Sequence, residues 1–484
     1  MKTKINFLIC LMLASCAFQG CHKKLDVNLE SAITANSMWQ SESDAVAAMY
    51  GTFNKFRSSF STSYIFWGEY RSGLWGSGLA TNATYSDAFS NELTRSHTHA
   101  NWANLYTTIN DCNLILKYTP NISFASETEK NRVLANALFI RAFCYYWIGR
   151  VWGDAPVLLN GFESGKQDDL YPSRDPASRV FEQVGIDLEQ ASLLMPNTPP
   201  VRNLASKAAI NMLRADYYLW MAKVRNGGNT ALDAAKLAVD AVLLDARYGL
   251  MDNFGDVFKS ELNKEIIFAW SYIRDEYTDG YPVDFLVPSQ YISTQYIENP
   301  IKVGSHQQWI FLTNDYKNFL STDNRDTRTT VSFETFYDQP KNSTFQWINK
   351  FAGHWENQTR IFDSDIIVYR YADALLLSAE IENALGNHPV AVDKLNEVAK
   401  RAYGVDDFYS DSLLPNEIDQ EILNERMKEF VAEGKIWWDL IRFGVVFDKV
   451  PSLAGKESKI NILLWPVHNN SINTNPNITP TEGY

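Results

Sequence analysis

The chain has 484 residues, of which 45% are hydrophobic and 21% are charged. This composition is typical of a globular protein with a substantial core, and it excludes a disordered or fibrous chain. There are 44 lysine and arginine residues against 57 aspartate and glutamate residues, which gives a net charge of −13. An acidic chain without a basic run argues against nucleic acid as a partner, because binding phosphates requires clustered cations.

The N-terminus has the pattern of a secretory signal. Residues 1–20 begin with a lysine-containing segment and continue into the apolar run Ile5–Phe18, which is too short for a membrane-spanning helix of about 20 apolar residues. Two cysteines that follow small residues, Cys16 and Cys21, are candidates for lipidation. We favour Cys21, because the apolar run is then complete, and keep Cys16 as the alternative. A secreted chain without lipid is a third interpretation.

Helical periodicity dominates much of the remaining chain. Two pairs of predicted helices are each joined by a turn that contains glycine and asparagine: Ala205–Ala222 with Ala231–Leu244, and Ile367–Leu385 with Val390–Ala402. Alanines recur where the helices of a pair would pack closely, as in a tetratricopeptide unit. We therefore predict a mostly α fold of tetratricopeptide-like helical hairpins, which stack and present a broad surface to a partner.

Two segments break this helical pattern. Residues 60–100 are rich in small polar and aromatic residues, and residues 272–360 mix aromatic, amide and acidic residues. A short β-like run, Glu265–Trp270, precedes the second segment. Long irregular segments in a compact protein are often functional loops, so we expect a loop-rich, partly β ligand-binding region. We predict a helical N-terminal half, residues 21–260, and a C-terminal half, residues 261–484, that share one core.

The acidic residues near the C-terminus invite comparison with catalytic carboxylates. Glu425, Glu429 and Glu433 are spaced four residues apart, which places them on one face of a helix. Like charges at this spacing repel each other unless they are paired, and Arg426 and Arg442 lie nearby in the sequence. We interpret the group as ion pairs that lock helix to helix, in preference to general acid and base residues.

Neither metal nor cofactor chemistry finds support in the sequence. The seven histidines are scattered, and the closest pair, His97 and His99, is interpreted as part of a solvated loop rather than as a metal site. Cys112 and Cys144 fit either a disulfide or two buried thiols. The phosphate-binding, nucleophile-elbow and dinucleotide-binding glycine motifs are all missing. We expect no cofactor, no metal and no catalytic activity.

Several motifs, taken in order, resemble one known family. The first two are an arginine-alanine-aromatic helix (137–146) and a tryptophan-glycine-aspartate turn (151–156). An acidic-arginine turn (323–328) and a long helix with alanines (365–379) follow. The last two are a glutamate-arginine and tryptophan-rich segment (425–442) and a tryptophan-proline closing signature (464–467). Their order and spacing resemble the SusD/RagB-type surface nutrient-binding lipoproteins over nearly the whole mature chain.

This resemblance implies a function as well as a fold. Members of the family have a helical, tetratricopeptide-like fold and a lipid anchor in the outer leaflet of the cell outer membrane. Their partner is a TonB-dependent channel of the SusC type, over which they close like a lid. Their ligands are glycans or, in some branches, peptides. The resemblance therefore implies a non-catalytic, surface-exposed lipoprotein that delivers a nutrient to a transporter.

The ligand site is expected in the irregular loops. A glycan site needs aromatic rings for the apolar faces of sugars, together with amides or carboxylates for the hydroxyls. The preferred candidates are Trp75 and Tyr85, because flanking glycine, serine and asparagine residues are expected to keep them out of a regular core. The other candidates are Trp67, Asn82, Asp87, Tyr291, Tyr296 and Trp309. An oligopeptide ligand, a lid without a ligand of its own and a surface glycosidase with two carboxylates in one cleft are the alternatives.

Overall fold

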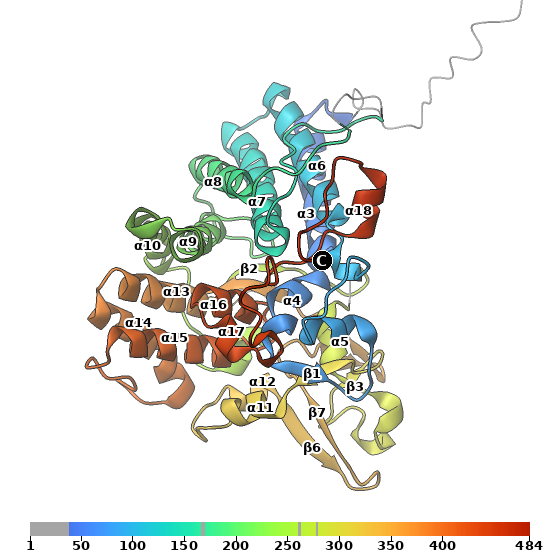
Figure 1. Ribbon diagram of the computed structural model, residues 1–484, viewed down its shortest axis with the longest axis vertical. Coiled ribbons are helices and arrows are strands. Elements are labelled where there is room, and N and C mark those ends of the chain that lie inside the picture. Colours follow the sequence, from blue (N-terminus) through green and yellow to red (C-terminus); the bar gives the residue numbers. More distant parts are fainter. Residues whose placement is uncertain (1–37, 166–169, 260–262, 277–278) are drawn as a thin grey trace, which may run out of the picture. The chain divides into compact units, whose positions relative to one another are not determined.

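The computed structural model describes residues 38–165, 170–259, 263–276 and 279–484 (Figure 1). Ser41–Tyr484 forms one compact unit. The predicted signal segment and both candidate lipidation residues, Cys16 and Cys21, lie outside the described residues. In the part of the chain that is described, no helix is both long enough and apolar enough to cross a membrane.

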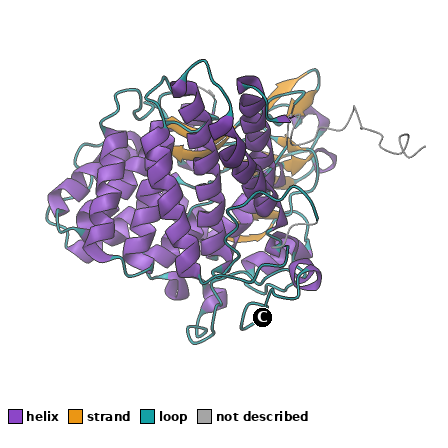
Figure 2. Cartoon of the chain, turned by 90° about the horizontal axis from the view of Figure 1, so that it is seen from above, coloured by secondary structure: helices purple, strands orange, loops and turns teal. Residues whose placement is uncertain are grey.

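Helices predominate in the described chain (Figure 2). Before residue 250, most of them pack against the next helix in the chain. They are α3 (Glu42–Phe60), α4 (Ser63–Gly68), α5 (Ala83–Phe89), α6 (Ala103–Tyr118), α7 (Glu127–Trp152), α8 (Ala177–Leu194), α9 (Lys207–Val224) and α10 (Gly228–Leu243). The last two form the first predicted hairpin, with bounds shifted by a few residues. The mostly α, helical-hairpin fold class is thereby confirmed.

The longest helix, α7, shows how local sequence sets the fold. From Val133 onward nearly every residue is buried, because the sequence is apolar on all sides of the helix. The helix ends at Trp152, since Gly153 takes a positive φ of 72°. Asp154 then accepts a hydrogen bond of 2.8 Å from the backbone N–H of Ala177, the first residue of α8. The tryptophan-glycine-aspartate turn therefore stops one helix and holds the start of the next.

The C-terminal region returns to helix after a short strand. Its elements are β10 (Ile366–Arg370), α13 (Tyr371–Ala384), α14 (His388–Tyr403), α15 (Pro415–Glu429), α16 (Ile436–Arg442), α17 (Val446–Lys449) and α18 (Asn469–Thr474). The prediction of a helix from Ile367 was wrong for its first four residues. These residues belong to β10, which pairs antiparallel with β2 (Ile266–Trp270), because β-branched and aromatic residues that are fully buried favour a strand.

The loop-rich region contains small two-stranded pairs. They are β1 (Trp75–Ser77) with β5 (Ile310–Leu312), β3 (Val287–Pro288) with β4 (Val303–Gly304), β6 (Glu334–Asp338) with β7 (Ser343–Trp347), and β8 (His354–Glu356) with β9 (Thr359–Ile361). Two short helices, α11 (Asn314–Leu320) and α12 (Thr329–Ser332), lie between them in sequence. The β1–β5 pair matters most, because it joins the two irregular segments singled out from the sequence.

An aromatic cluster joins the two predicted halves. Phe56 and Phe60 of α3 lie 5.6 and 5.2 Å from Trp270 of β2, measured between ring centroids. Phe143 of α7 packs on the same tryptophan at 6.0 Å. Rings at these separations attract each other beyond the effect of burial alone. Side chains from both sides of residue 260 thus share this cluster, and the division of the chain at that residue stays a prediction.

Buried ion pairs hold the C-terminal helices, as the sequence predicted. Glu425 pairs with Arg328 at 2.6 Å, and Glu433 pairs with Arg370 at 2.8 Å. Glu429 contacts both of these arginines. The ion-pair interpretation is confirmed, but the partners differ from those expected. The glutamates pair mainly with cations from other elements, whereas Arg426 and Arg442 pair with three other acidic residues, Asp373, Asp439 and Glu380. Helix α15 also ends at Glu429, so Glu433 lies beyond it.

Candidate functional site

Two of the predicted ligand residues are buried in the core. Trp67 is 1% exposed, and its indole N–H donates to the backbone oxygen of His99 at 2.8 Å. Trp75 is 2% exposed and stacks on Phe285 with 5.2 Å between ring centroids. The expectation that Trp75 stays out of a regular core is wrong, and Trp67 is covered as well. For Trp75 the reason is that the β1–β5 pair brings the second irregular segment over the first and covers the indole.

Tyr85 lies at the centre of a small polar group. Its hydroxyl donates to Oδ2 of Asp284 at 2.6 Å, and Oδ1 of Asp284 lies 3.4 Å from Nε2 of His306. Asp284 is 5% exposed, and this burial raises the pKa of its carboxyl to about 6, against the hydrogen bond from Tyr85. The group thus combines a partly exposed ring, a carboxyl that titrates near neutral pH and an exposed imidazole.

Two further rings, those of Tyr291 and Trp309, contact the segment of His306 or belong to it. The hydroxyl of Tyr291 donates to Oε1 of Gln307 at 3.3 Å, and the backbone N–H of Gly78 donates to the oxygen of Trp309 at 3.2 Å. Tyr291 is 40% exposed, while Tyr85 and Trp309 are half-buried. We call Tyr85, Tyr291, His306 and Trp309 the aromatic surface. It is held in place by backbone hydrogen bonds between segments more than 200 residues apart in sequence.

Two of the three remaining predicted residues lie at helix α5, which also carries Tyr85. Asn82 caps α5 by accepting a hydrogen bond from the N–H of Thr84 at 2.9 Å, and Asp87 lies partly exposed on the same helix. Tyr296 instead packs edge-on against Phe336, 4.9 Å away, at a neighbouring apolar cluster. Sequence reasoning missed Asp284 and His306. The two residues are distant in the sequence, and only the fold brings the carboxyl and the imidazole together.

The predicted solvated histidines are buried. His99 stacks on Phe66 with 3.7 Å between ring centroids, and burial lowers the pKa of His99 to about 3. His97 packs against Trp465 at 5.0 Å, so the interpretation of a solvated loop was wrong. Aromatic neighbours from distant segments cover both rings. Within the described ranges, no group of three or more histidine, cysteine, aspartate or glutamate side chains is arranged to hold a metal ion.

The two cysteines of the helical region are both free and buried. Cys112 lies on α6 and Cys144 on α7. Burial raises the pKa of each thiol well above its ordinary value, which keeps the sulfurs protonated. Of the two alternatives left open by the sequence, the structure has two buried thiols.

Comparison with solved structures identifies the fold as that of the SusD superfamily. NanU of Bacteroides fragilis superposes with a TM-score of 0.81 and 26% identity, covering 94% of this chain and 99% of that protein. A SusD superfamily protein from Bacteroides vulgatus superposes with a TM-score of 0.79 and 26% identity, over 92% of this chain and all of that one. The protein class is therefore a helical SusD-like protein.

Sequence comparisons place the chain more closely. A model described as the SusD family matches residues 306–484, and one described as starch-binding and associating with the outer membrane matches residues 26–219. The SusD-like protein P38 of Formosa agariphila is 25% identical over 99% of this chain and 98% of its own length. The starch-binding protein SusD of Bacteroides thetaiotaomicron is 30% identical over 25% of this chain and 22% of its own. The chain belongs to the SusD/RagB family, as its motifs predicted.

Proposed function

We propose that the protein is a non-catalytic surface lipoprotein that binds a glycan and delivers it to a SusC-type TonB-dependent transporter. The family description, starch-binding and associating with the outer membrane, supports this role. So does the name of the relative called starch-binding protein SusD. The structural observation that carries the proposal is the aromatic surface. There the partly exposed ring of Tyr85 and the exposed imidazole of His306 both contact Asp284, and the segment of His306 also carries Trp309 and contacts Tyr291.

The chemistry of this surface suits a sugar. The faces of Tyr85, Tyr291 and Trp309 offer contact to the apolar C–H side of a sugar ring. The exposed imidazole of His306 and the amide of Gln307 offer hydrogen bonds to hydroxyls, while the buried carboxyl of Asp284 holds Tyr85 and His306 in place. Because backbone hydrogen bonds already fix the loops that carry these groups, little conformational entropy is lost when a ligand binds.

The carboxylates first considered for catalysis do not support a glycosidase. Glu425, Glu429 and Glu433 are fully buried and lie in ion pairs with arginines or Lys350. A general acid or base must reach its substrate, and these groups face only protein. Their role is to hold helices together, which leaves binding and delivery as the function that the aromatic surface supports.

The anchor and partner complete the proposal. Lipidation of Cys21, with Cys16 as the alternative, attaches the protein to the outer leaflet of the outer membrane, where the transporter lies. Mass spectrometry of the mature N-terminal peptide tests the anchor: a diacylated peptide beginning at residue 21 is expected. Lipid on a peptide that begins at residue 16 would move the anchor to Cys16, and an unmodified mature terminus would contradict the anchor.

Isothermal titration calorimetry against glycan and peptide libraries tests the ligand. We expect a glycan to bind, and Trp309→Ala and Tyr291→Ala each to weaken binding by about fivefold or more, because stacked rings contribute about 1 kcal/mol or more each. Tyr50→Ala, which removes a 51% exposed tyrosine of α3 outside the aromatic surface, is the control. Binding of peptides alone would favour the oligopeptide alternative, and binding of neither would favour a lid without a ligand of its own.

A further inference from the structure

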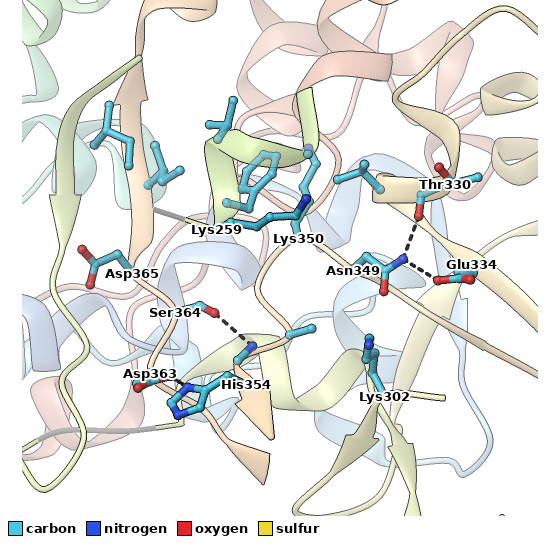
Figure 3. Close-up of a pocket in the computed structure, with 18 residues that line it drawn as sticks. Lys259, Lys302, Thr330, Glu334, Asn349, Lys350, His354, Asp363, Ser364 and Asp365 are labelled. Carbon is cyan, nitrogen blue, oxygen red and sulfur yellow. Dashed lines mark hydrogen bonds and ion pairs between the residues drawn. The ribbon is translucent and has the colours of Figure 1, made fainter. Parts of the chain in front are cut away.

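A second cavity lies apart from the aromatic surface, with a volume of about 820 Å³ (Figure 3). This is within the range of about 300–1,000 Å³ that is typical of small-molecule sites. It is bounded by a short 3-10 helix, η5 (Phe254–Phe258), together with residues of β2, α12 and the segments that follow β7 and β9. Val257, Phe258, Ile266, Val331 and Ile367 give it an apolar part, and most of the other lining residues are polar.

The acidic side chains that line this pocket already have partners. Oε2 of Glu334 accepts a hydrogen bond from Asn349 at 2.7 Å, and Oδ1 of Asp363 lies 3.0 Å from Nδ1 of His354. Oδ1 of Asp365 accepts from a backbone N–H at 2.8 Å. Figure 3 shows the Asn349–Glu334 contact on one side of the pocket and the His354–Asp363 contact on another.

Two of the three lysines in the lining are also paired. The ammonium of Lys350 lies 2.7 Å from Glu433, and it donates to the backbone oxygen of Glu429. Lys259 lies 3.0 Å from Asp256. These two cations are therefore already balanced by the protein, and they leave little unsatisfied charge for a ligand.

Lys302 differs from these lysines. Its half-buried ammonium has no hydrogen-bond acceptor or carboxylate within contact distance among the described residues. Burial lowers the pKa of Lys302, and the nearby charge of Arg360 lowers it further, against the weaker opposing effect of Glu334. In Figure 3 the Lys302 side chain lies in the wall of the pocket, across from the His354–Asp363 contact.

Arg360 reinforces the positive charge behind the same wall. It is 7% exposed, and its Nη1 donates to the backbone oxygen of Ala352, which lines the pocket. Its Nε is buried without a hydrogen-bond partner among the described residues, where the guanidinium also has no ion pair. Glu334 attracts Lys302 and Glu298 attracts Arg360, but neither carboxylate is within ion-pair distance, and desolvated cations favour a partner of opposite sign in direct contact.

We propose that this pocket is a second binding site, which takes a monosaccharide carrying one anionic group, a carboxylate or a sulfate ester, with that group on Lys302. The volume exceeds the need of a bare inorganic anion, and the apolar part suits the C–H face of a sugar ring. The hydroxyl of Ser364 accepts from the N–H of Gly353 at 3.0 Å, so its own proton is available to a sugar oxygen. The site is independent of the aromatic surface and of the function proposed for it.

Titration calorimetry at low ionic strength tests the site with three matched sugars. The probes are D-galacturonate, D-galactose 6-sulfate and neutral D-galactose. We expect at least one anionic sugar to bind, and D-galactose to bind about tenfold more weakly or worse, because a charge-assisted contact is lost. The anionic sugar that binds identifies which acidic group the site accepts.

Variants test whether the anionic sugar binds in this pocket. Lys302→Gln is expected to reduce binding of the anionic sugar about tenfold or more, to the level of D-galactose. Lys459→Gln, at an exposed lysine outside the pocket, is expected to leave binding unchanged, and thermal melts establish that both variants fold. Trp309→Ala, which damages the aromatic surface, is expected to retain binding of the anionic sugar.

Four results would overturn the inference. They are equal binding of D-galactose, no binding of either anionic sugar, unchanged affinity in folded Lys302→Gln, and binding of inorganic sulfate as tight as that of the sugars. Loss of anionic sugar binding in Trp309→Ala would place the ligand on the aromatic surface instead. Failure of the glycan proposal would be a different result, namely unchanged glycan binding in Trp309→Ala and Tyr291→Ala.

Discussion

The buried ion pairs of the C-terminal helices differ from the pocket wall around Lys302 in whether their charged side chains are paired. In the first region, Glu425, Glu429 and Glu433 each contact at least one cation, and all are fully buried. In the second region, the cations of Lys302 and Arg360 lie near each other, and neither has a carboxylate within ion-pair distance among the described residues. Buried charges that are all paired within the protein stabilise the fold, whereas cations without a paired carboxylate can bind an anionic ligand.

Removing a cation from the buried ion pairs of the C-terminal helices should have the largest effect on the free energy of unfolding. Arg370 is fully buried and contacts Glu265, Glu429 and Glu433 at 2.9, 2.5 and 2.8 Å. Arg370→Met is expected to lower the free energy of unfolding by about 3–5 kcal/mol, because buried carboxylates lose their partner. Urea denaturation followed by circular dichroism measures this change.

The control for Arg370 is an arginine in an exposed ion pair. Arg325 pairs with Asp323 at 2.5 Å, and its side chain is 52% exposed. Arg325→Met is expected to leave the free energy of unfolding nearly unchanged, because solvent screens such pairs. If both variants unfolded at the same urea concentration, the buried network would not be the element that holds these helices.

A second comparison concerns two tryptophans that the sequence could not tell apart. Trp75 is 2% exposed and Trp309 is half-buried. Trp75→Ala is expected to lower the free energy of unfolding by about 3 kcal/mol or more, because it leaves a cavity in the core. Trp309→Ala is expected to lower stability less and glycan affinity more. Chemical denaturation and calorimetry on both variants measure the two effects, and the opposite ranking would return Trp75 to the ligand site.

The tryptophans also show how far the sequence predicts this protein. Local patterns predicted the stop of α7 at Gly153 and the hairpin of α9 and α10, because neighbouring residues determine caps and helical faces. The charges of Glu425 and Glu429 predicted ion pairs, since buried carboxylates need cations, but not the partners. Trp75 could not be placed, because its burial depends on Leu312, its cross-strand partner 237 positions further along the chain. The same limit hid the contact of Asp284 with His306.

The aromatic surface should respond to pH through Asp284. Burial raises the pKa of its carboxyl from an ordinary 3.8 to about 6, so the folded protein binds a proton more tightly than the unfolded chain does. The stability from this group is present below about pH 4 and is lost as pH rises through about 6, by up to about 3 kcal/mol. Tyr85 and His306 are the titratable groups in contact with it.

Asp284→Asn isolates this effect. The difference in unfolding free energy between wild type and variant should move in favour of the variant as pH rises from 4 to 7, because asparagine does not titrate. Urea denaturation at four or five pH values measures the difference. A difference that stays constant over this range would mean that Asp284 is not held protonated by its burial.

The smallest expected change in stability is that of a Lys302 variant, and its sign should be opposite to that of Arg370→Met. Lys302→Met removes a half-buried cation that has no counter-ion within contact among the described residues and that lies near Arg360. Without ligand, the variant is expected to be more stable than wild type by less than about 1 kcal/mol, since solvent screens part of the repulsion. With the anionic sugar present, the order should reverse, because only wild type gains stability from binding. Thermal melts with and without D-galacturonate and D-galactose 6-sulfate measure both orders. A destabilised ligand-free variant would mean that Lys302 is already balanced, like the cations around Arg370, and the contrast between the two regions would fail.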